Sequence, residues 1–313
     1  ALARLLHEEG FARMTAGDSC GFGSPVRIMR ELGMAEAFDK YGVAMGEFRE
    51  AVPVTFPEGI HAREFMAARE VCEADAIISV SKMKTHALEH ITGAVKNQYG
   101  CVQGFHKARG HTLYPSPESF ARMLVDLNRW AAPRLYIMDG IMAMEGNGPT
   151  SGDPVPMNVL LLSKDPVALD SVFSHLVYLN PELVPTNVCG AQMGLGFWQE
   201  DRIELVTPKG ELSLEGAAAR YGNPGFRVSR KREKVRGWMG AAGIFRFLQK
   251  KPKIIPERCR KCGVCVDSCP VEGKALSFAN GRNHPPVYNY KKCIRCFCCQ
   301  EMCPHKAIRV RGM

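Results

Sequence analysis

Residues 259–270 read CRKCGVCVDSCP, and residues 293–304 read CIRCFCCQEMCP. Each stretch places four cysteines at the spacing C-x2-C-x2-C-x3-C and follows the last cysteine with proline. Nine of the 13 cysteines in the chain lie within its last 55 residues. Because a disulfide framework would not require two such groups, the clustering indicates metal ligands in a reducing compartment.

The repeated spacing is typical of bacterial ferredoxins that hold two [4Fe–4S] clusters, in which three close thiolates bind one cluster and the fourth binds the other. It predicts one cluster on Cys259, Cys262, Cys265 and Cys303, and a second on Cys293, Cys296, Cys299 and Cys269. We therefore expect a small α+β, ferredoxin-like domain over 254–313 that relays electrons. The alternatives are two zinc sites, or clusters that only stabilise a small domain. The additional Cys298 is expected to be a buried residue that binds no metal.

The first 226 residues are expected to form a separate α/β domain. The chain has 313 residues, 46% of them hydrophobic and 23% charged, which is ordinary for folded globular proteins. Apolar runs alternate with amphipathic stretches, a pattern that predicts a mostly parallel sheet with helices on both faces. The expected strands are 11–16, 75–81, 134–139, 158–163 and 202–206, and the expected helices are 25–33, 61–73, 117–130 and 166–179.

Polar residues follow several of these strands. Because ligands of open α/β sheets bind beyond the carboxyl ends of the strands, we expect a site there. The candidate catalytic residues are Lys82, Lys84, His86, Lys96 and Asp139. The candidate cofactor-binding residues are Asp18, Ser19, Thr85, Asn97, Glu145, Asn147 and Asp165. Paired lysines beside a threonine suit an anion, such as a phosphate, a carboxylate or a flavin. The alternative is that these residues form ordinary solvated turns and helix caps.

The segment His86-Ala-Leu-Glu89-His90 also spells H-x-x-E-H, which on a helix would place two imidazoles and a carboxylate together as in a zinc peptidase. Lys82 and Lys84 stand immediately before it, and a zinc site prefers neutral or anionic surroundings. We therefore favour a cationic cluster of Lys82, Lys84 and His86, with His90 as an ordinary histidine on the face of a helix. A metal-dependent hydrolase with structural clusters remains the weaker alternative.

Four stretches carry a family resemblance. They are GDSCGFGSP (17–25), DAIISVSKMKTHALEHITGAVKNQYG (75–100), DGIMAMEGNGPTSGDP (139–154) and LLLSKDPVALDSV (160–172). Together with the cysteine motifs, they resemble the domain of unknown function 362 (DUF362) family, iron–sulfur members of which carry a C-terminal two-cluster ferredoxin module. The resemblance covers about residues 10–206 and 255–310 and implies an α/β domain with a redox role. It also implies that the body lacks the first strand of the family, because members begin with a Lys-Pro-Asn-like strand.

Charge is unevenly distributed along the chain, whose net charge is +9. Basic residues outnumber acidic ones by 13 to 4 in 251–313 and by 8 to 1 in 227–250, whereas acidic residues lead by 27 to 20 in 1–226. Two clusters of about −2 each would leave the last segment basic. We therefore expect an acidic redox protein (ferredoxin or flavodoxin) or a larger redox complex as partner. No nucleic-acid-binding module is recognisable.

Residues 227–253 form a basic linker that contains several large apolar residues. The segment could lie on a membrane surface as an amphipathic helix, or pack on its own protein. No apolar run approaches the roughly 20 residues needed to span a bilayer, and the first ten residues lack the features of a signal peptide. A cytoplasmic protein, with peripheral membrane contact as an option, is the expectation.

Two hypotheses on function follow. The first is an oxidoreductase that passes electrons from the two clusters to a cofactor or substrate at the strand-end site. The second is a non-catalytic electron carrier whose α/β body docks on a larger complex.

Overall fold

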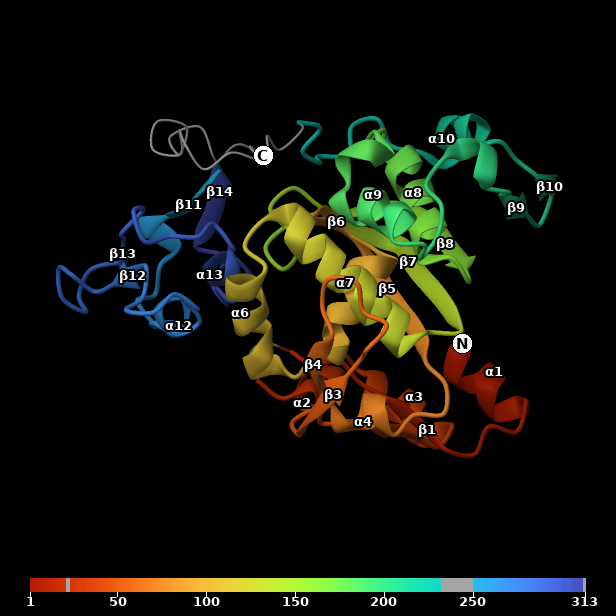
Figure 1. Cartoon of the computed structure of the whole chain (residues 1–313), viewed down its shortest axis with the longest axis horizontal. Helices are drawn as coiled ribbons and strands as arrows, with labels where there is room; N and C mark the ends of the chain where they lie inside the picture. Colours follow the sequence, from red (N-terminus) through yellow and green to blue (C-terminus); the bar gives the residue numbers. More distant parts are fainter. Residues whose placement is uncertain (21–22, 232–249, 312–313) are drawn as a thin grey trace.

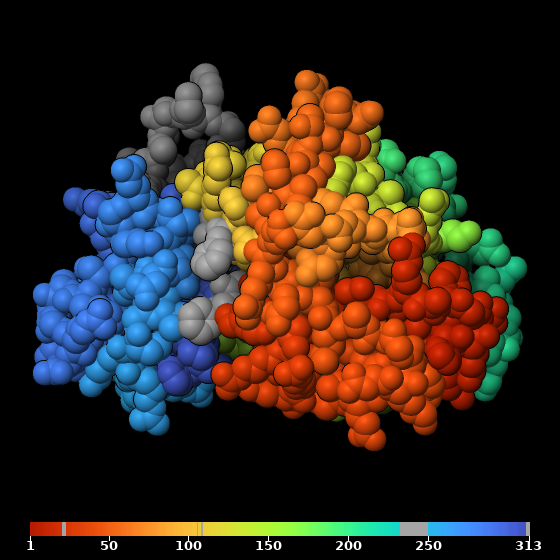
Figure 2. Space-filling view, turned by 90° about the horizontal axis from the view of Figure 1, so that it is seen from below, coloured from red at the N-terminus to blue at the C-terminus, as the bar shows by residue number. Residues whose placement is uncertain are grey.

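The computed structural model describes residues 1–20, 23–231 and 250–311. Residues 1–231 form the body, and residues 250–311 form a smaller iron–sulfur module at one end of the molecule, blue in Figures 1 and 2. The predicted linker (227–253) therefore lies largely outside the described residues.

The N-terminal part of the body contains two small sheets. Strands β1 (Met14–Ala16) and β2 (Val43–Met45) pair in parallel, and β3 (Ala51–Thr55) and β4 (Glu64–Ala68) pair antiparallel. The helices of this part are α1 (Leu2–Glu8), α2 (Pro25–Glu31), α3 (Met34–Lys40) and α4 (Arg69–Cys72). The helix predicted at 61–73 is mostly wrong, because 64–68 pair with β3 as a strand. Cross-strand packing has outweighed the helical pattern there.

The main sheet of the body has the strand order β6-β5-β7-β8. Its strands are β5 (Ile78–His86), β6 (His90–Thr92), β7 (Leu135–Glu145) and β8 (Asp153–Ser163). Only β5 and β7 pair in parallel, whereas β5–β6 and β7–β8 are antiparallel. The body is thus α/β, but a mostly parallel sheet is not confirmed. The Gly/Pro-rich stretch after the predicted strand 134–139 is the tip of a long hairpin, and a hairpin makes neighbouring strands antiparallel.

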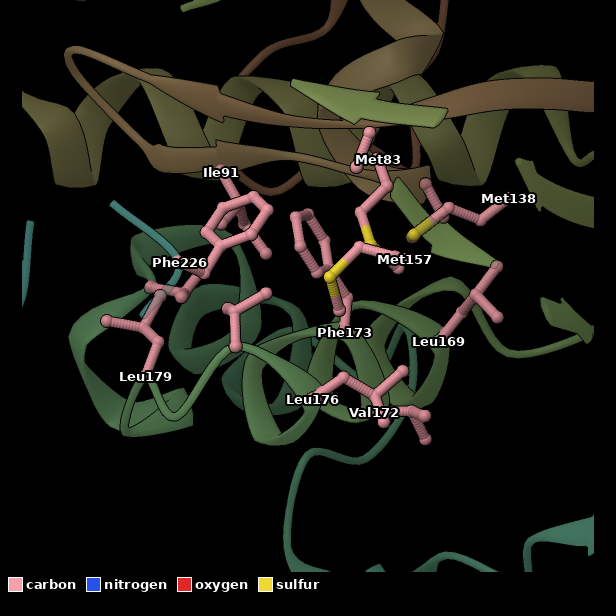
Figure 3. Close-up of a cluster of buried hydrophobic side chains, with 14 of the residues drawn as sticks. Met83, Ile91, Met138, Met157, Leu169, Val172, Phe173, Leu176, Leu179 and Phe226 are labelled. Atoms are coloured by element: carbon pink, nitrogen blue, oxygen red, sulfur yellow. The ribbon is translucent and has the colours of Figure 1, made fainter. Parts of the chain in front are cut away.

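Helices cover one face of this sheet. Met83, Met138 and Met157 point from it toward Phe173 and other side chains of α8 in a buried cluster (Figure 3). On the opposite face Val80, Leu160 and Leu162 are each more than half exposed. Among the described residues, the expected second layer of helices does not cover these positions. The helical segments around the sheet are α5 (Ala94–Asn97), α6 (Gly104–Leu113), α7 (Pro117–Ala131), α8 (Pro166–Leu176), α9 (Pro185–Gln192), α10 (Leu214–Tyr221) and the 3-10 turns Gln98–Cys101, Pro181–Leu183 and Glu200–Arg202.

Proline and side-chain caps fix where the long helices begin. Ser116 accepts a hydrogen bond from the Ser119 amide at the start of α7, and Asp165 caps α8, with proline as the first residue of each helix. The sequence predicted both starts. Beyond α9, the predicted strand at 202–206 is reduced to β9 (Val206–Thr207), paired with β10 (Gly210–Glu211).

The iron–sulfur module is built from short elements around the cysteines. Strands β11 (Lys251–Ile254) and β14 (Ile308–Arg311) pair antiparallel, as do β12 (Leu276–Ser277) and β13 (Val287–Tyr288). Between them lie the turn Pro256–Arg258 and the helices α12 (Val264–Asp267) and α13 (Cys298–Glu301). Its core consists largely of the cysteines themselves, together with Ile254, Ala275, Leu276 and Ile308. A module with so small an apolar core needs additional cross-links, which clusters would supply.

Candidate functional site

Three cysteines of the first motif and one of the second line a hollow in the module. Its lining includes Cys259, Cys262, Cys265 and Cys303, the four residues predicted to share one cluster. The thirteen cysteines are all free of disulfide bonds. In the described residues, no three or more His, Cys, Asp or Glu side chains are arranged to hold a single metal ion. A hollow lined by four thiols suits a four-iron cube, which takes one thiolate at each iron.

The second set of cysteines lies deeper in the module. Cys269, Cys293 and Cys299 are buried, and Cys298 is buried beside them as expected. Sulfurs of both sets receive hydrogen bonds: the Ala275 amide donates to Cys269 Sγ of the second set (3.3 Å), and the Ala307 amide donates to Cys303 Sγ of the first set (3.3 Å). The Tyr288 hydroxyl lies 3.2 Å from Cys299 Sγ. Donors directed at sulfur are the environment that cluster thiolates require, so the residues present fit the group.

The second motif contacts the body through Glu301, which lies between Cys299 and Cys303. Glu301 Oε1 is 2.9 Å from His86 Nε2 at the end of β5. His86 Nδ1 accepts hydrogen bonds from the backbone amides of Leu88 and Glu89. Since Nδ1 is an acceptor, the imidazole proton sits on Nε2, and His86 donates it to the Glu301 carboxylate. Burial lowers the pKa of His86 to about 4, which keeps the ring neutral.

Two lysines of the body flank this hydrogen bond. Burial, followed by the neighbouring Lys96 ammonium, lowers the pKa of Lys84. Burial raises the pKa of the Glu301 carboxyl, but the positive charge of Lys96 and the contact with His86 outweigh it, so the pKa of Glu301 lies below its usual value. Neither Lys84 nor Lys96 forms an ion pair with a described carboxylate, whereas Lys107 lies 4.0 Å from Asp18. Two adjacent lysines in a mostly buried place, near the Glu301 carboxylate but in no direct ion pair with it, favour the binding of a further anion.

The aromatic ring of Tyr99 supports these cations. The Nζ atoms of Lys96 and of Lys107 each lie 5.9 Å from the ring centroid. Lys107 also donates to the Ser19 carbonyl, and its pKa is lowered by burial. We call Lys84, Lys96, Lys107 and Tyr99 the lysine site. It adjoins the second cysteine motif, because Cys296, Cys298 and Glu301 all act electrostatically on Tyr99.

Comparison with known families assigns the body to one of them. Residues 1–175 match the family model described as Domain of unknown function (DUF362). The chain belongs to this family. A second model, the 4Fe-4S dicluster domain, matches residues 251–304 and so supports [4Fe–4S] clusters and iron–sulfur electron transfer in the module.

A curated relative of the DUF362 body is the Thylakoid-associated protein sll1697 of Synechocystis sp., which is 35% identical over 196 residues. The match covers 62% of this chain and 60% of the relative, so the chain spans less than two thirds of that protein. Within the described ranges, no helix has the length and apolarity needed to cross a membrane.

The DUF362 body brings some of the predicted site residues together. Lys84, His86 and Lys96 meet at the interface with the module, and Asp18 and Ser19 lie beside Lys107. Lys82 instead pairs with Asp139 (Nζ to Oδ2, 2.5 Å) on the open face of the sheet. Asp139 also accepts from the Ile141 amide, which fixes the chain at the irregularity in the β5–β7 pairing.

Other predicted cofactor-binding residues make structural hydrogen bonds. Thr85 Oγ1 donates to the Gly146 carbonyl, and the Asn97 amide donates to Ser79 Oγ. Glu145 accepts from Arg227, and Asp165 accepts from the amides of Val167, Ala168 and Phe197. Asn147 bonds to the module through Ile308 and Val310. We do not include these residues in the proposed site, because their polar atoms are used in hydrogen bonds that stabilise the body and its interface with the module.

The H-x-x-E-H segment is a tight β-hairpin, so its interpretation as helical is wrong. His86 ends β5, His90 begins β6, and the two residues are cross-strand partners. Glu89 is fully buried without a partner for either oxygen, and burial raises the pKa of its carboxyl well above the usual value. His90 Nδ1 contacts the Ser229 carbonyl. Among the described residues, no three or more His, Cys, Asp or Glu side chains of this segment are arranged to hold a single metal ion.

Three contributors to the site were not predicted from the sequence: Lys107, Tyr99 and Glu301. Glu301 sits inside the cysteine motif, where the spacing of the sulfurs says nothing of the residues between them. Tyr99 follows Lys96 by about one helical turn, and this spacing could have indicated that the two side chains meet. Lys107 lies further along the chain, where the spacing gives no such signal.

Proposed function

We propose that this DUF362 protein is an iron–sulfur oxidoreductase that exchanges electrons between its clusters and an anionic organic cofactor or substrate at the lysine site. The observation that carries the proposal is the hydrogen bond between His86 and Glu301. It joins the body to the second cysteine motif at the place where Lys84 and Lys96 lie without a direct ion pair to a described carboxylate. The cation site and one cysteine set therefore share a single interface.

The residues at this interface have distinct proposed roles. Lys84 and Lys96 bind and orient the anion, since an ammonium group offers three donors and a full charge. His86, held neutral, fixes the position of the Glu301 carboxylate through the hydrogen bond from Nε2. The clusters, when bound, supply one-electron transfer. Burial around His86 and Glu301 limits water at the interface, which strengthens the attraction between the lysines and an anion.

The metal assignment that goes with this function stays a proposal as well. Cys259, Cys262, Cys265 and Cys303 are proposed to bind cluster 1, and Cys293, Cys296, Cys299 and Cys269 to bind cluster 2. The hollow lined by the first set supports the first assignment.

An anaerobic inventory of metals and organic molecules tests the proposal. We expect iron and sulfide for two clusters, a reducible cluster signal by EPR, and an organic anion that co-purifies with the wild-type protein. Lys84→Gln should lose that anion, whereas Lys82→Gln, which removes the same charge from the open face of the sheet, should retain it. Absence of a reducible cluster, or equal retention of the anion by both variants, would contradict the proposal.

A second candidate is a non-catalytic electron carrier attached to a membrane-associated redox complex. The name of the Synechocystis relative, a thylakoid-associated protein, favours it, as does the basic character of residues 227–250. This candidate predicts clusters without a bound organic anion, and co-sedimentation of the full chain with vesicles that contain anionic lipid. Loss of co-sedimentation at high salt would identify the contact as electrostatic.

A further inference from the structure

The two cysteine sets differ in their access to solvent. In the first set Cys262 is exposed, and Cys259 and Cys303 are partly exposed. In the second set Cys269, Cys293 and Cys299 are buried, and only Cys296 is partly exposed. An electron carrier in solution can therefore approach the first set more closely than the second.

The contacts with the body are also unequal. Gln300, Glu301 and the strand β14 hydrogen-bond to the body around residues 86 and 147–150. In the part of the chain that the structure describes, no hydrogen bond or ion pair joins residues 255–270 to the body. The first cysteine set thus remains free for an external partner, while the second set adjoins the lysine site.

Four exposed cations lie in the hollow or next to its lining residues along the chain. Arg260 and Lys261 line the hollow together with Cys259 and Cys262, Arg258 immediately precedes Cys259, and Lys306 follows the lining residue His305. We call Arg258, Arg260, Lys261 and Lys306 the basic collar. Glu257 and Asp267 are the acidic residues among 251–270, and none of the four cations pairs with a described carboxylate. Their charge is therefore available to a partner.

We propose that the basic collar is the docking surface for an acidic electron-transfer protein that exchanges electrons with cluster 1. The proposal rests on the proposed function. The partner gives up one electron and is oxidised, and the cluster takes up that electron and is reduced. With both clusters bound, the electron would pass from cluster 1 to cluster 2 and then to the organic anion proposed at the lysine site, which would be reduced. A protein partner is favoured because complementary charge brings its redox centre next to the exposed Cys262.

Stopped-flow reduction of the full, cluster-loaded chain tests this surface. The probes are a reduced acidic plant-type ferredoxin and reduced methyl viologen, which is a small cation. In Arg260→Glu/Lys261→Glu, the rate constant with ferredoxin should fall by about tenfold or more at low ionic strength. The loss should largely disappear at about 0.5 M salt, where charges are screened within a few ångströms. The rate with methyl viologen should not fall.

The matched control is Lys291→Glu/Lys292→Glu, which changes the same charge on exposed residues of the same module beside the buried cysteine set. It should retain the ferredoxin rate to within about threefold. Equal losses of the ferredoxin rate in both variants, or no loss in the collar variant, would overturn the docking surface. Rapid reduction by methyl viologen in the same experiment would leave the proposed function intact. Failure of both probes to reduce any cluster would overturn the proposed function itself. If the collar variant loses binding to anionic vesicles but keeps the ferredoxin rate, the collar binds a lipid surface. That result would overturn the proposal of a protein partner.

Discussion

Gly93 separates strand β6 from helix α5 at the point where the backbone touches Asp170. A β-carbon at this position would lie 1.9 Å from Asp170 Oδ1 and 2.7 Å from Met138 Cε. The Asp170 carboxylate is not free to retreat, because its oxygens accept from the amides of Ala94 (2.5 Å) and Val95 (3.1 Å). Gly93→Ala must therefore displace either the carboxylate or the first turn of α5, the helix that carries Lys96.

The cost of this substitution follows from the contacts that are lost. Overpacking a buried site costs about 1–3 kcal/mol, and losing one amide hydrogen bond to a charged acceptor costs about 1.5–3 kcal/mol. Together they predict a loss of about 3–6 kcal/mol in the free energy of unfolding. At roughly 2–4 °C per kcal/mol, the apparent unfolding temperature should fall on the order of 10 °C. The anion retained at Lys84 and Lys96 should be lost in parallel.

The assay is thermal unfolding of anaerobic, cluster-loaded protein by far-ultraviolet circular dichroism at one scan rate. The matched control is Gly225→Ala, where the nearest atom to the added carbon is Asn223 Oδ1 at 3.3 Å. This variant should remain close to wild type. A Gly93→Ala protein that unfolds within about 2 °C of Gly225→Ala would refute the reasoning, since it would show that Asp170 yields at little cost.

Burial raises the pKa of Asp170 to about 7. The folded state therefore holds this proton more tightly than the unfolded state. The free energy of unfolding should fall by up to about 4 kcal/mol as the pH rises from about 4 to 7, and it should then level off. Asp170→Asn should flatten that slope, as measured by unfolding temperatures between about pH 5.5 and 8. Tyr288→Phe removes the hydroxyl beside Cys299 Sγ and should lower the midpoint potential of one cluster, because hydrogen bonds to sulfur stabilise the reduced form; an EPR-monitored redox titration checks this. Gln300→Leu removes two hydrogen bonds to the carbonyls of Asn147 and Gly148 and should raise amide hydrogen exchange in residues 146–152 while the cluster absorbance stays unchanged.

The cysteine motifs were predictable because cluster chemistry fixes their spacing along the chain. The spacing from Cys259 to Cys269 needs no knowledge of tertiary structure, and the family model over 251–304 supports the clusters it predicts. The starts of α7 and α8 were equally local, since Ser116 and Asp165 cap helices that open with proline. In both cases the signal lies within a few consecutive residues.

The direction of the strands was not predictable in the same way. The run 158–163 reads as a buried strand whether it lies parallel or antiparallel to its neighbour. Its direction was decided by the segment between β7 and β8, which turns the chain back upon itself. The H-x-x-E-H spelling failed for a related reason. The pairing of His86 with His90 across a hairpin depends on the sheet, and the spacing of the residues along the chain does not record it.

The lysine site shows where sequence reasoning stops. Lys84, His86 and Lys96 were predicted to act together, and they do lie together. Their closest partner in the module, Glu301, lies 215 positions beyond His86. Only the docking of the module on the body brings the two side chains into contact.

Asn147 at the tip of the β7–β8 hairpin has a consequence beyond the interface. Its Nδ2 donates to the Ile308 carbonyl (3.0 Å), and its Oδ1 accepts from the Val310 amide (3.4 Å). The Ile308 carbonyl and the Val310 amide point outward from the same edge of β14. Arg309 points its backbone groups toward β11, at the opposite edge. Pro252, which has no amide proton, stands across from Val310, where none is needed. A single side-chain amide therefore covers the outer edge of the terminal strand. An uncovered edge is a template for pairing with another chain, so this asparagine protects the module against self-association.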